Sequence, residues 1–459
     1  MIESNDSRSV VNAWFNSKPT IVRRIILAIA IGIVAGLGAV LFYSALEYGT
    51  RFFLQDLGGY LVPTPGGEGN VAGSSSFAHP LLIPLIVTLG GLISGLMVFT
   101  WAPEAEGHGT DAAISAIHHN PRGIRVRAVA VKIFASAITI GSGGSGGREG
   151  PTAQISAGFG SLLSRTLNLS DADAKMAVSI GVGSGIGAIF SAPLGGALLA
   201  SEIVYRDDFE SEALLPGLVA SGIAYLIFGS VYGFQPIFTV VEHGLFTSNI
   251  QLIYYALLGI LCGVIGIIYS KTFYLTVNLS KKIALPRKYH PALGGLLVGI
   301  TALFAPEVLG TGYGWIQKAL SANSLEAIPF WIVILLPFLR IIVTSLSIGS
   351  GGSGGIFGPG MVIGAFIGAG FWRVAEIYLP HVPNSPAGFV IVAMMACFGS
   401  ISRAPIAVTI MVAEMTSNIS MIFPAVVAVG IASLIAAAFD VTIYQAQLRD
   451  RNDLGLSTS

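Results

Sequence analysis

The apolar residues of this chain fall in long, nearly uninterrupted stretches. Several stretches reach the roughly 18–20 residues that a helix needs to cross a bilayer. Others contain only about 11–15 residues and are too short to cross alone, so we expect tilted or broken helices whose interruptions face protein or water. The stretches are Ile25–Tyr43, Pro80–Trp101, Ala213–Phe228, Leu252–Ile268, Leu293–Pro306, Ala327–Leu339, Met361–Phe371 and Met421–Phe439.

The chain also contains an internal duplication. The sequence GSGGSGG at Gly141–Gly147 returns unchanged at Gly349–Gly355. Further pairs occur in the same order, which is the signature of repeated structural units. These pairs are Leu89–Gly95 with Leu293–Gly299, Ala102–Glu104 with Ala305–Glu307, Ala192-Pro193 with Ala404-Pro405, and Glu202 with Glu414.

The duplication predicts a polytopic all-α membrane protein with two repeats. We expect a cytoplasmic segment (1–20), a first membrane repeat (20–225), a connection (226–249), a second membrane repeat (250–448) and a short tail (449–459). Repeats of this kind are typical of transporters, whose sites lie near the bilayer midplane on discontinuous helices.

The charges support a membrane protein with lipid around it. Only 10% of the 459 residues are charged, and the 24 basic and 24 acidic residues cancel. A soluble protein has roughly 25% charged residues, and nothing in this balance indicates nucleic-acid binding. The positive-inside rule places the basic clusters, and with them both termini, in the cytoplasm, most simply of a cell (inner) membrane. The clusters are Arg23-Arg24, Arg122–Arg127, Lys281–Lys288 and Arg449–Arg451.

The sequence motifs do not support an enzymatic site, a cofactor site or a metal site. Gly141, Gly143 and Gly146 match a dinucleotide-binding pattern, but apolar segments flank them and no βαβ context is present. The two cysteines sit in apolar runs, and His118-His119 fit a polar helix end better than a metal site. We therefore expect that the chain is not an enzyme and binds neither a cofactor nor a metal.

The repeated glycine segments suit an anion. Pro151 and Pro359 each follow a glycine-rich segment and open an apolar stretch, and proline fits the first turn of a helix. Glycines let backbone N–H groups approach a bound species closely. A helix start offers free N–H donors and partial positive charge, at the modest strength of about 0.3–2 kcal/mol that a conducting site needs.

The two segments differ at one pair of positions. Arg148-Glu149 in the first half corresponds to Ile356-Phe357 in the second. A carboxylate just before a helix start can occupy the place of an anion and block the path until it is protonated or moves. Carboxylates inside a membrane are costly and indicate function, so we interpret Glu149 as a gate; the alternative is an N-terminal charge cap.

At these residues the chain resembles the CLC chloride channel/transporter family. Gly147–Pro151 matches the family's G-R-E-G-P motif, and Gly355–Pro359 is similar to its G-[IV]-F-x-P motif. The similarity runs over most of residues 25–450. It implies two inverted-topology repeats whose tilted helices meet at a midplane anion site, and a homodimer with one pore in each subunit.

The resemblance also implies roles for individual residues. Glu149 would be the external gate, and Arg148 would add positive potential at the outer mouth. The central anion would be held by N–H groups of Ile356 and Phe357 and by the Tyr444 hydroxyl, although an interfacial anchor is the plainer interpretation of Tyr444. The neighbouring Gly109, Gly150 and Gly358 complete the expected anion-binding set.

One departure concerns the family's G-S-G-I-P motif. The matching stretch is Gly107–Asp111, in which His108 replaces the serine whose hydroxyl contacts the anion. A neutral imidazole can still donate one hydrogen bond, and protonation near pH ~6.5 would tune anion affinity. Alternatively, the glycine backbone holds the anion and His108 points away.

The other departure concerns protons. Ile203 stands where proton-coupled members usually carry an inner glutamate. Glu202 beside it is either part of a proton path or, since Glu414 matches it in the second half, a structural carboxylate. Lys132, in an apolar run, is expected to pair with one of these acids or with Asp111. The expected function is proton-coupled chloride antiport, and the alternative is a passive gated anion channel.

Overall fold

The computed structural model describes residues 15, 17–74, 76–241 and 246–453 and is helical throughout. Within these ranges it contains no β-strand, only isolated backbone bridges. Seven of the described helices are long and apolar enough to cross a membrane. The predicted all-α, multi-pass architecture is therefore confirmed.

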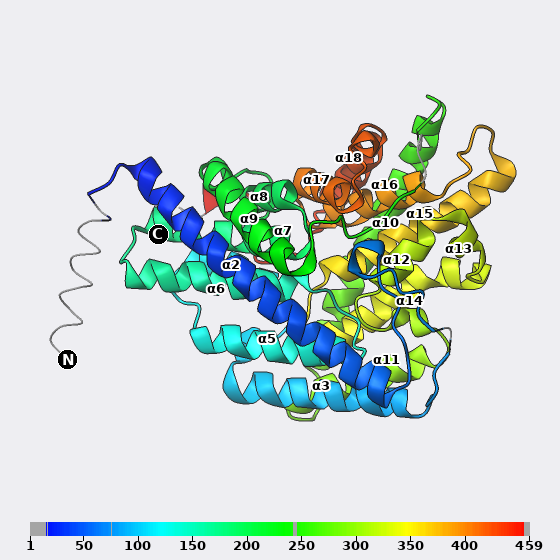
Figure 1. The fold of residues 1–459 in the computed structure, drawn as a ribbon, viewed down its shortest axis with the longest axis horizontal. Helices are drawn as coiled ribbons and strands as arrows, with labels where there is room; N and C mark the ends of the chain where they lie inside the picture. Colours follow the sequence, from blue (N-terminus) through cyan, green and yellow to red (C-terminus); the bar gives the residue numbers. More distant parts are fainter. Residues whose placement is uncertain (1–14, 16, 75, 242–245, 454–459) are drawn as a thin grey trace.

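The first half begins with a long helix that runs into a π-helical turn. Its elements are α2 (Thr20–Thr50), η1 (Arg51–Leu57), η2 (Gly66–Glu68), α3 (Leu82–Trp101), η3 (Pro103–Ala105), α4 (Thr110–His119), α5 (Val126–Gly141), α6 (Glu149–Thr166), α7 (Asp171–Ile189), α8 (Pro193–Glu202) and α9 (Ser211–Tyr232). Helices α2, α5 and α3 run across the molecule side by side (Figure 1).

The second half repeats the order of the main helices and adds a short helix, α13 (Ala322–Glu326). Its elements are α10 (Gln251–Ser280), η4 (Arg287–Tyr289), α11 (His290–Ala302), η5 (Pro306–Val308), α12 (Tyr313–Ala319), α13 (Ala322–Glu326), α14 (Phe330–Gly349), α15 (Phe357–Tyr378), α16 (Ala387–Ile401), α17 (Pro405–Thr416), η6 (Ile419–Met421) and α18 (Ile422–Ala438). Cys262 and Cys397 are buried and unpaired in this half, as expected for core residues.

The duplication extends to the backbone conformation. Matched residues of the two halves share a positive φ, which L-residues other than glycine adopt only at a cost. The pairs are Gly107 with Gly310, Gly109 with Gly312, Gly143 with Gly351, and Ser191 with Arg403. Both halves therefore repeat the same turns as well as the same helices.

The two halves are inverted relative to each other. Helices α3 and α11 pack closely, and a methyl group on Gly91 would meet the carbonyl of Pro291 while one on Gly299 would meet Pro84. The start of α3 thus lies beside the end of α11, so the helices are antiparallel. This confirms the inverted-repeat arrangement.

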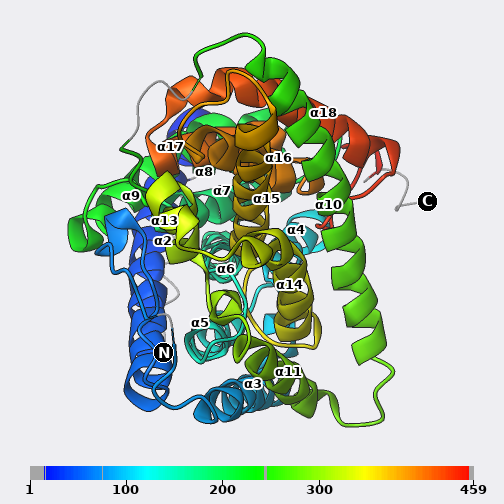
Figure 2. The same ribbon diagram turned by 90° about the vertical axis from the view of Figure 1, so that its right-hand side faces the viewer.

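The centre of the molecule is built around α6 and α15. Both lie in the middle of the bundle, with α2, α3, α11, α14 and α10 around them (Figure 2). Pro151 and Pro359 lie in the first turns of these two helices, where a missing N–H is tolerated. The glycine-rich segments before them bring both helix starts into the interior.

The basic clusters meet on one face of the bundle. Short acidic segments link them through ion pairs, and Arg125 holds the pKa of Glu104 below its usual range. The four clusters are therefore neighbours on one face of the molecule. The pairs are Arg24 with Glu212, Arg122 with Asp171, Arg125 with Glu104, Arg287 with Glu106, and Arg451 with Asp208 and Glu210.

Candidate functional site

Three glycine segments meet in the interior. Gly147 and Gly355 exchange two backbone hydrogen bonds, with N–O distances of 2.8 and 2.7 Å. Gly107 joins the same cluster, because its N–H donates to Gly352 and its carbonyl accepts from Gly354. The starts of α4, α6 and α15 are therefore tied together by main-chain contacts between the two halves.

The Glu149 carboxylate occupies the start of α15. Its side chain is buried, and Oε1 accepts a 2.7 Å hydrogen bond from the Phe357 N–H. The space exists because two neighbours lack side chains: a methyl group on Gly147 or Gly355 would overlap the carboxylate. A charge-assisted bond at a helix start is the contact that a free anion would make there.

Side-chain contacts connect other predicted residues to the start of α15. Ile356 precedes α15, and its carbonyl accepts a 2.9 Å hydrogen bond from the buried hydroxyl of Tyr269. Phe357 packs on Phe398 at a ring distance of 4.4 Å, and Phe398 lies 6.2 Å from the ring of Tyr444. Tyr444 is buried, so it belongs to the interior of the bundle.

The loop before α4 completes the cluster. A methyl group on Gly150 would meet the His108 carbonyl, and one on Gly109 would lie 2.7 Å from the Gly150 carbonyl. One on Gly358 would lie 2.5 Å from the Tyr313 hydroxyl. All the residues predicted to bind the anion are thus brought to one region around the starts of α4, α6 and α15.

His108 is buried between Asp111 and Tyr444. Its Nε2 lies 3.3 Å from Asp111 Oδ2, and its ring lies 5.6 Å from that of Tyr444. Within the described part of the chain, Nδ1 is buried and has no hydrogen-bond partner. The ring therefore has one nitrogen aimed at a carboxylate and one available for a ligand or water.

Asp111 is a junction between the halves. Besides His108, it accepts hydrogen bonds of 3.2 Å from the Tyr274 hydroxyl on α10 and from the Ala446 N–H. Because Ala446 follows Tyr444 closely, Asp111 fixes the segment that carries the tyrosine. From the sequence, Asp111 is expected only as one of the possible partners of Lys132.

Two buried cations hold the matching loops of the two halves. Lys132 is fully buried, and its ammonium donates to the carbonyls of Ala105 and Gly107 at 3.1 and 2.7 Å. Arg340 is the matching residue of α14, and its guanidinium donates to the carbonyls of Val308 and Gly310, among others. The prediction that Lys132 pairs with an acidic side chain is wrong, because the carbonyls of the loop accept its hydrogen bonds instead.

Glu202 and Ile203 lie at the end of α8. The Glu202 carboxylate accepts bonds of 3.1 and 2.6 Å from the N–H groups of Ile406 and Ala407, at the start of α17. Ile203 is buried, and its carbonyl accepts a 2.9 Å bond from the Gln447 amide. No sequence signal points to Gln447, because an isolated glutamine belongs to no motif.

Arg148 has a partner that the sequence did not reveal. Its Nη2 lies 2.5 Å from Oε1 of Glu68 in η2, and its guanidinium lies over the rings of Tyr43 and Tyr313. The expected positive potential is therefore balanced locally. Glu68 lies in a glycine-rich stretch without periodicity, which gives no signal for a site.

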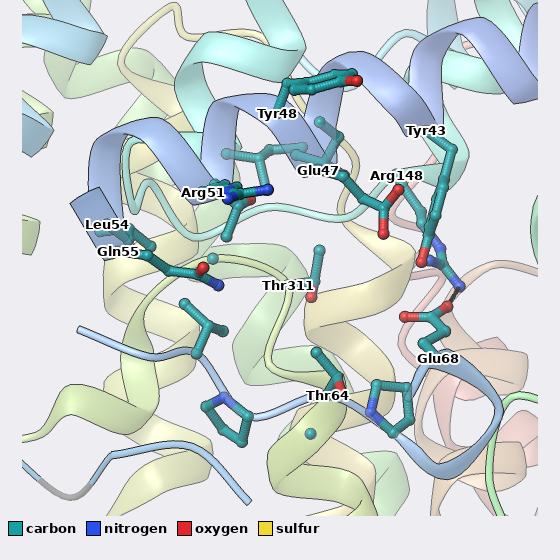
Figure 3. Close-up of a pocket in the computed structure, with 18 of the residues that line it drawn as sticks. Tyr43, Glu47, Tyr48, Arg51, Leu54, Gln55, Thr64, Glu68, Arg148 and Thr311 are labelled. Atoms are coloured by element: carbon teal, nitrogen blue, oxygen red, sulfur yellow. Dashed lines mark ion pairs between the residues drawn. The ribbon is translucent and has the colours of Figure 1, made fainter. Parts of the chain in front are cut away.

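A cavity of about 470 Å³ opens beside this ion pair. Figure 3 shows Glu47, Arg51 and Gln55 reaching into it from one side, with Thr64 and Thr311 opposite and the Arg148–Glu68 pair at one end. The cavity lies at the end of α2 that is remote from Arg23 and Arg24 of the basic face. We therefore refer to it as the outer cavity. Charged residues of both signs line this cavity.

The described residues contain no group of three or more His, Cys, Asp or Glu side chains that could hold a metal ion. His118 and His119 contact backbone carbonyls instead, those of Val204 and Ser115. These contacts fit the polar helix end expected for the pair.

Comparisons with known proteins agree with this architecture. Residues 90–437 match a family model described as "Voltage gated chloride channel". The chain is 31% identical over 353 residues to an H(+)/Cl(-) exchange transporter, ClcA, of Vibrio parahaemolyticus, a match that covers 75% of this chain and 74% of the relative.

Two solved structures share the fold. A slow cyanobacterial Cl⁻/H⁺ antiporter superposes with a TM-score of 0.78 at 23% identity, covering 95% of this chain and 97% of the other. A CLC-type fluoride/proton antiporter gives 0.76 at 19% identity, covering 93% and 98%.

Proposed function

Since the chain belongs to the voltage gated chloride channel (CLC) family, whose members are membrane transporters of anions, we propose that it is a proton-coupled chloride antiporter gated by Glu149. The anion would bind at the starts of α15 and α4, between the N–H groups of Ile356 and Phe357 and the Tyr444 hydroxyl. The relative named as an H(+)/Cl(-) exchange transporter supports this assignment.

One contact carries the gating proposal. The Glu149 carboxylate is hydrogen-bonded to the Phe357 N–H at 2.7 Å, which is a position that a chloride would use. Two negative charges cannot share one buried helix start without strong repulsion. Chloride therefore enters this position only when the carboxylate is displaced or protonated, and this exclusion links an anion to a proton at one position.

A passive channel is the alternative, and Ile203 favours it. The buried isoleucine offers no titratable group where coupled members usually have one. A proton would then have to reach Glu149 along water or through Glu202, the residue beside Ile203, whose two oxygens are already engaged by backbone N–H groups.

The reversal potential separates the two functions. Purified protein in liposomes would be placed under opposed chloride and proton gradients, and the voltage of zero current measured. An antiporter reverses at a potential that shifts with the proton gradient. Reversal at the chloride equilibrium potential, independent of pH, would exclude antiport, and absence of any anion current or flux would exclude both functions.

We further propose that the basic face lies in the cytoplasm and that the protein resides in a cell (inner) membrane as a homodimer. The positive-inside rule supports the orientation. Large apolar side chains are exposed on α8, α9, α17 and α18 and suit contact with lipid or a second copy. They include Leu194, Leu215, Ile406, Phe423 and Val426.

A further inference from the structure

Arg148 is the charged group nearest to the proposed gate in sequence, and it is enclosed. Its side chain is only 3% exposed, and the guanidinium lies 5.0 Å from the ring centre of Tyr43 and 4.9 Å from that of Tyr313. Phe190 lies on a third side at 5.8 Å. The aromatic cage restricts access to the cation to the direction in which Glu68 approaches.

Glu68 is presented to Arg148 by a pinned loop. The N–H of Gly66 donates to the Gln317 side chain at 3.0 Å, and the N–H of Gly67 donates to the Ile237 carbonyl at 2.9 Å. A methyl group on Gly66 would overlap Thr239. The loop is therefore held by contacts of its own and does not require the ion pair to keep its place.

Two buried donor groups near the Arg148 guanidinium lack a hydrogen-bond partner among the described residues, as does the Oε2 acceptor of the adjacent Glu149. Arg148 Nε and the Tyr313 hydroxyl are both buried, and neither has a hydrogen-bond partner in the described part of the chain. The Tyr313 hydroxyl lies against Gly358, in the first turn of the helix whose start binds Glu149. Unsatisfied buried donors are costly unless a ligand or water meets them.

Resting on the proposed function, we propose that Arg148 and Tyr313 form an outer anion site and that the Glu68 carboxylate occupies it as a second tethered anion. Glu68 and Glu149 then stand in series along the path. An anion arriving from the outer cavity competes with Glu68 for the guanidinium before it meets Glu149. Glu68 is a competitor, not a group that moves the proton to the gate.

The charges that face Glu68 decide how strong this competition is. Arg148 attracts it directly, whereas Glu47 on α2 shares its two neighbouring cavities and repels it. Arg51 of η1 also lines the outer cavity, as do the hydroxyl-bearing Tyr43 and Tyr232. Glu68 is thus attracted by Arg148 and repelled by Glu47. This balance allows an incoming anion to displace its carboxylate from the guanidinium.

The test is Glu68→Gln, which keeps the shape of the side chain and removes its charge. Chloride uptake into liposomes would be measured against chloride concentration on the outer and the basic side separately. We expect the half-saturating chloride concentration on the outer side to fall roughly three- to tenfold, the scale of one net hydrogen bond, with that on the basic side unchanged. Glu68→Asp, which retains the charge, should lower this concentration less than Glu68→Gln does.

Asp56→Asn is the matched control. Asp56 is exposed in η1, close in sequence to the cavity-lining residues but not itself among them, so its loss tests for a general effect of outer-face charge. An equal fall with Asp56→Asn would overturn the proposal. So would an unchanged or raised outer half-saturation in Glu68→Gln, which would assign Glu68 to structural support of Arg148.

Two further measurements keep the outcome interpretable. Thermal unfolding in detergent reports whether each variant folds, and Tyr313→Phe, which removes only the hydroxyl, should raise the outer half-saturating concentration; no change there would overturn the assigned site. Failure of the proposed function itself would appear differently, as an absence of chloride flux in the parent protein.

Discussion

Glu202 and Glu414 each cap the start of the helix that carries the other residue. The Glu202 carboxylate, at the end of α8, accepts N–H groups from the start of α17, and the Glu414 carboxylate, near the end of α17, accepts those of Leu194 and Gly195 at the start of α8. Both carboxylates therefore complement the positive end of a helix that belongs to the other half.

This reciprocity predicts a structural role for both carboxylates. Glu202→Ala and Glu414→Ala should each lower the free energy of unfolding by about 0.5–2 kcal/mol, the value of a helix cap, and leave the chloride-to-proton ratio unchanged. Thermal unfolding in detergent and liposome flux would measure both. Loss of proton movement in Glu202→Ala alone, with Glu414→Ala normal, would instead place Glu202 on a proton path.

Neutralising the gate should fix it open. Glu149→Gln keeps the size of the side chain but loses the charge-assisted bond to Phe357, so chloride competes for the site without needing a proton. We expect chloride flux to become independent of pH and proton movement to stop. Glu376→Gln, exposed near the end of α15, is the control; a pH response retained in Glu149→Gln would assign the titration to another group.

A single methyl group should displace the gate without altering its charge. In Gly355→Ala the new side chain would overlap the Glu149 carboxylate, which then has to leave the start of α15. It would also lie 2.8 Å from the Gly147 carbonyl, so thermal unfolding in detergent must show that the variant folds. Chloride flux should lose much of its pH dependence although Glu149 remains. Gly222→Ala is the control, since a methyl group there has nothing within 4 Å; normal gating in Gly355→Ala would show that the carboxylate binds elsewhere when the protein works.

The two buried cations should differ in importance. If Lys132 is replaced by Met, the Ala105 carbonyl keeps the Ser353 hydroxyl as a donor and the Gly107 carbonyl keeps the Gly354 N–H. The Arg340 guanidinium donates to four carbonyls, those of Glu307, Val308, Gly310 and Thr311, and each one left without a donor costs about 1–3 kcal/mol. Arg340→Met should therefore lower the unfolding temperature more than Lys132→Met; equal effects would contradict this account.

His108 is expected to shape anion preference through its free nitrogen. His108→Ser shortens the side chain and removes the Nδ1 atom that lacks a partner among the described residues, so the relative fluxes of chloride, nitrate and bromide should change. His119→Ser, at the exposed end of α4, should leave them as they are. Identical ratios in both variants would show that the glycine backbone alone selects the anion.

Much of this arrangement could be predicted because it depends on patterns of residues that are close together in the sequence or repeated in the other half. Long apolar runs identify spanning helices, and the repeated glycines identify turns that only a flexible backbone can make, as the matched positive φ values of Gly143 and Gly351 demonstrate. The contrast between Glu149 and its counterpart Phe357 then pointed to the place where the halves differ. These signals depend on neighbours in sequence or on a matching residue in the repeat.

The partners of the buried charges could not be predicted in the same way. Lys132 is satisfied by main-chain carbonyls, which every residue possesses, so no side-chain pattern marks them. Glu68 reaches Arg148 from a loop far away in sequence, and its contact depends on how η2 folds over the bundle. Such pairs are decided by tertiary packing.

The main-chain link between Gly147 and Gly355 also bears on how such a protein could originate. Neither half holds a complete site: one supplies the carboxylate, and the other supplies the N–H that receives it. An ancestor consisting of a single half could have built this centre only by pairing with an inverted copy of itself. Gene fusion would then have freed the two copies to diverge, so that one kept an acid and the other the apolar start of a helix.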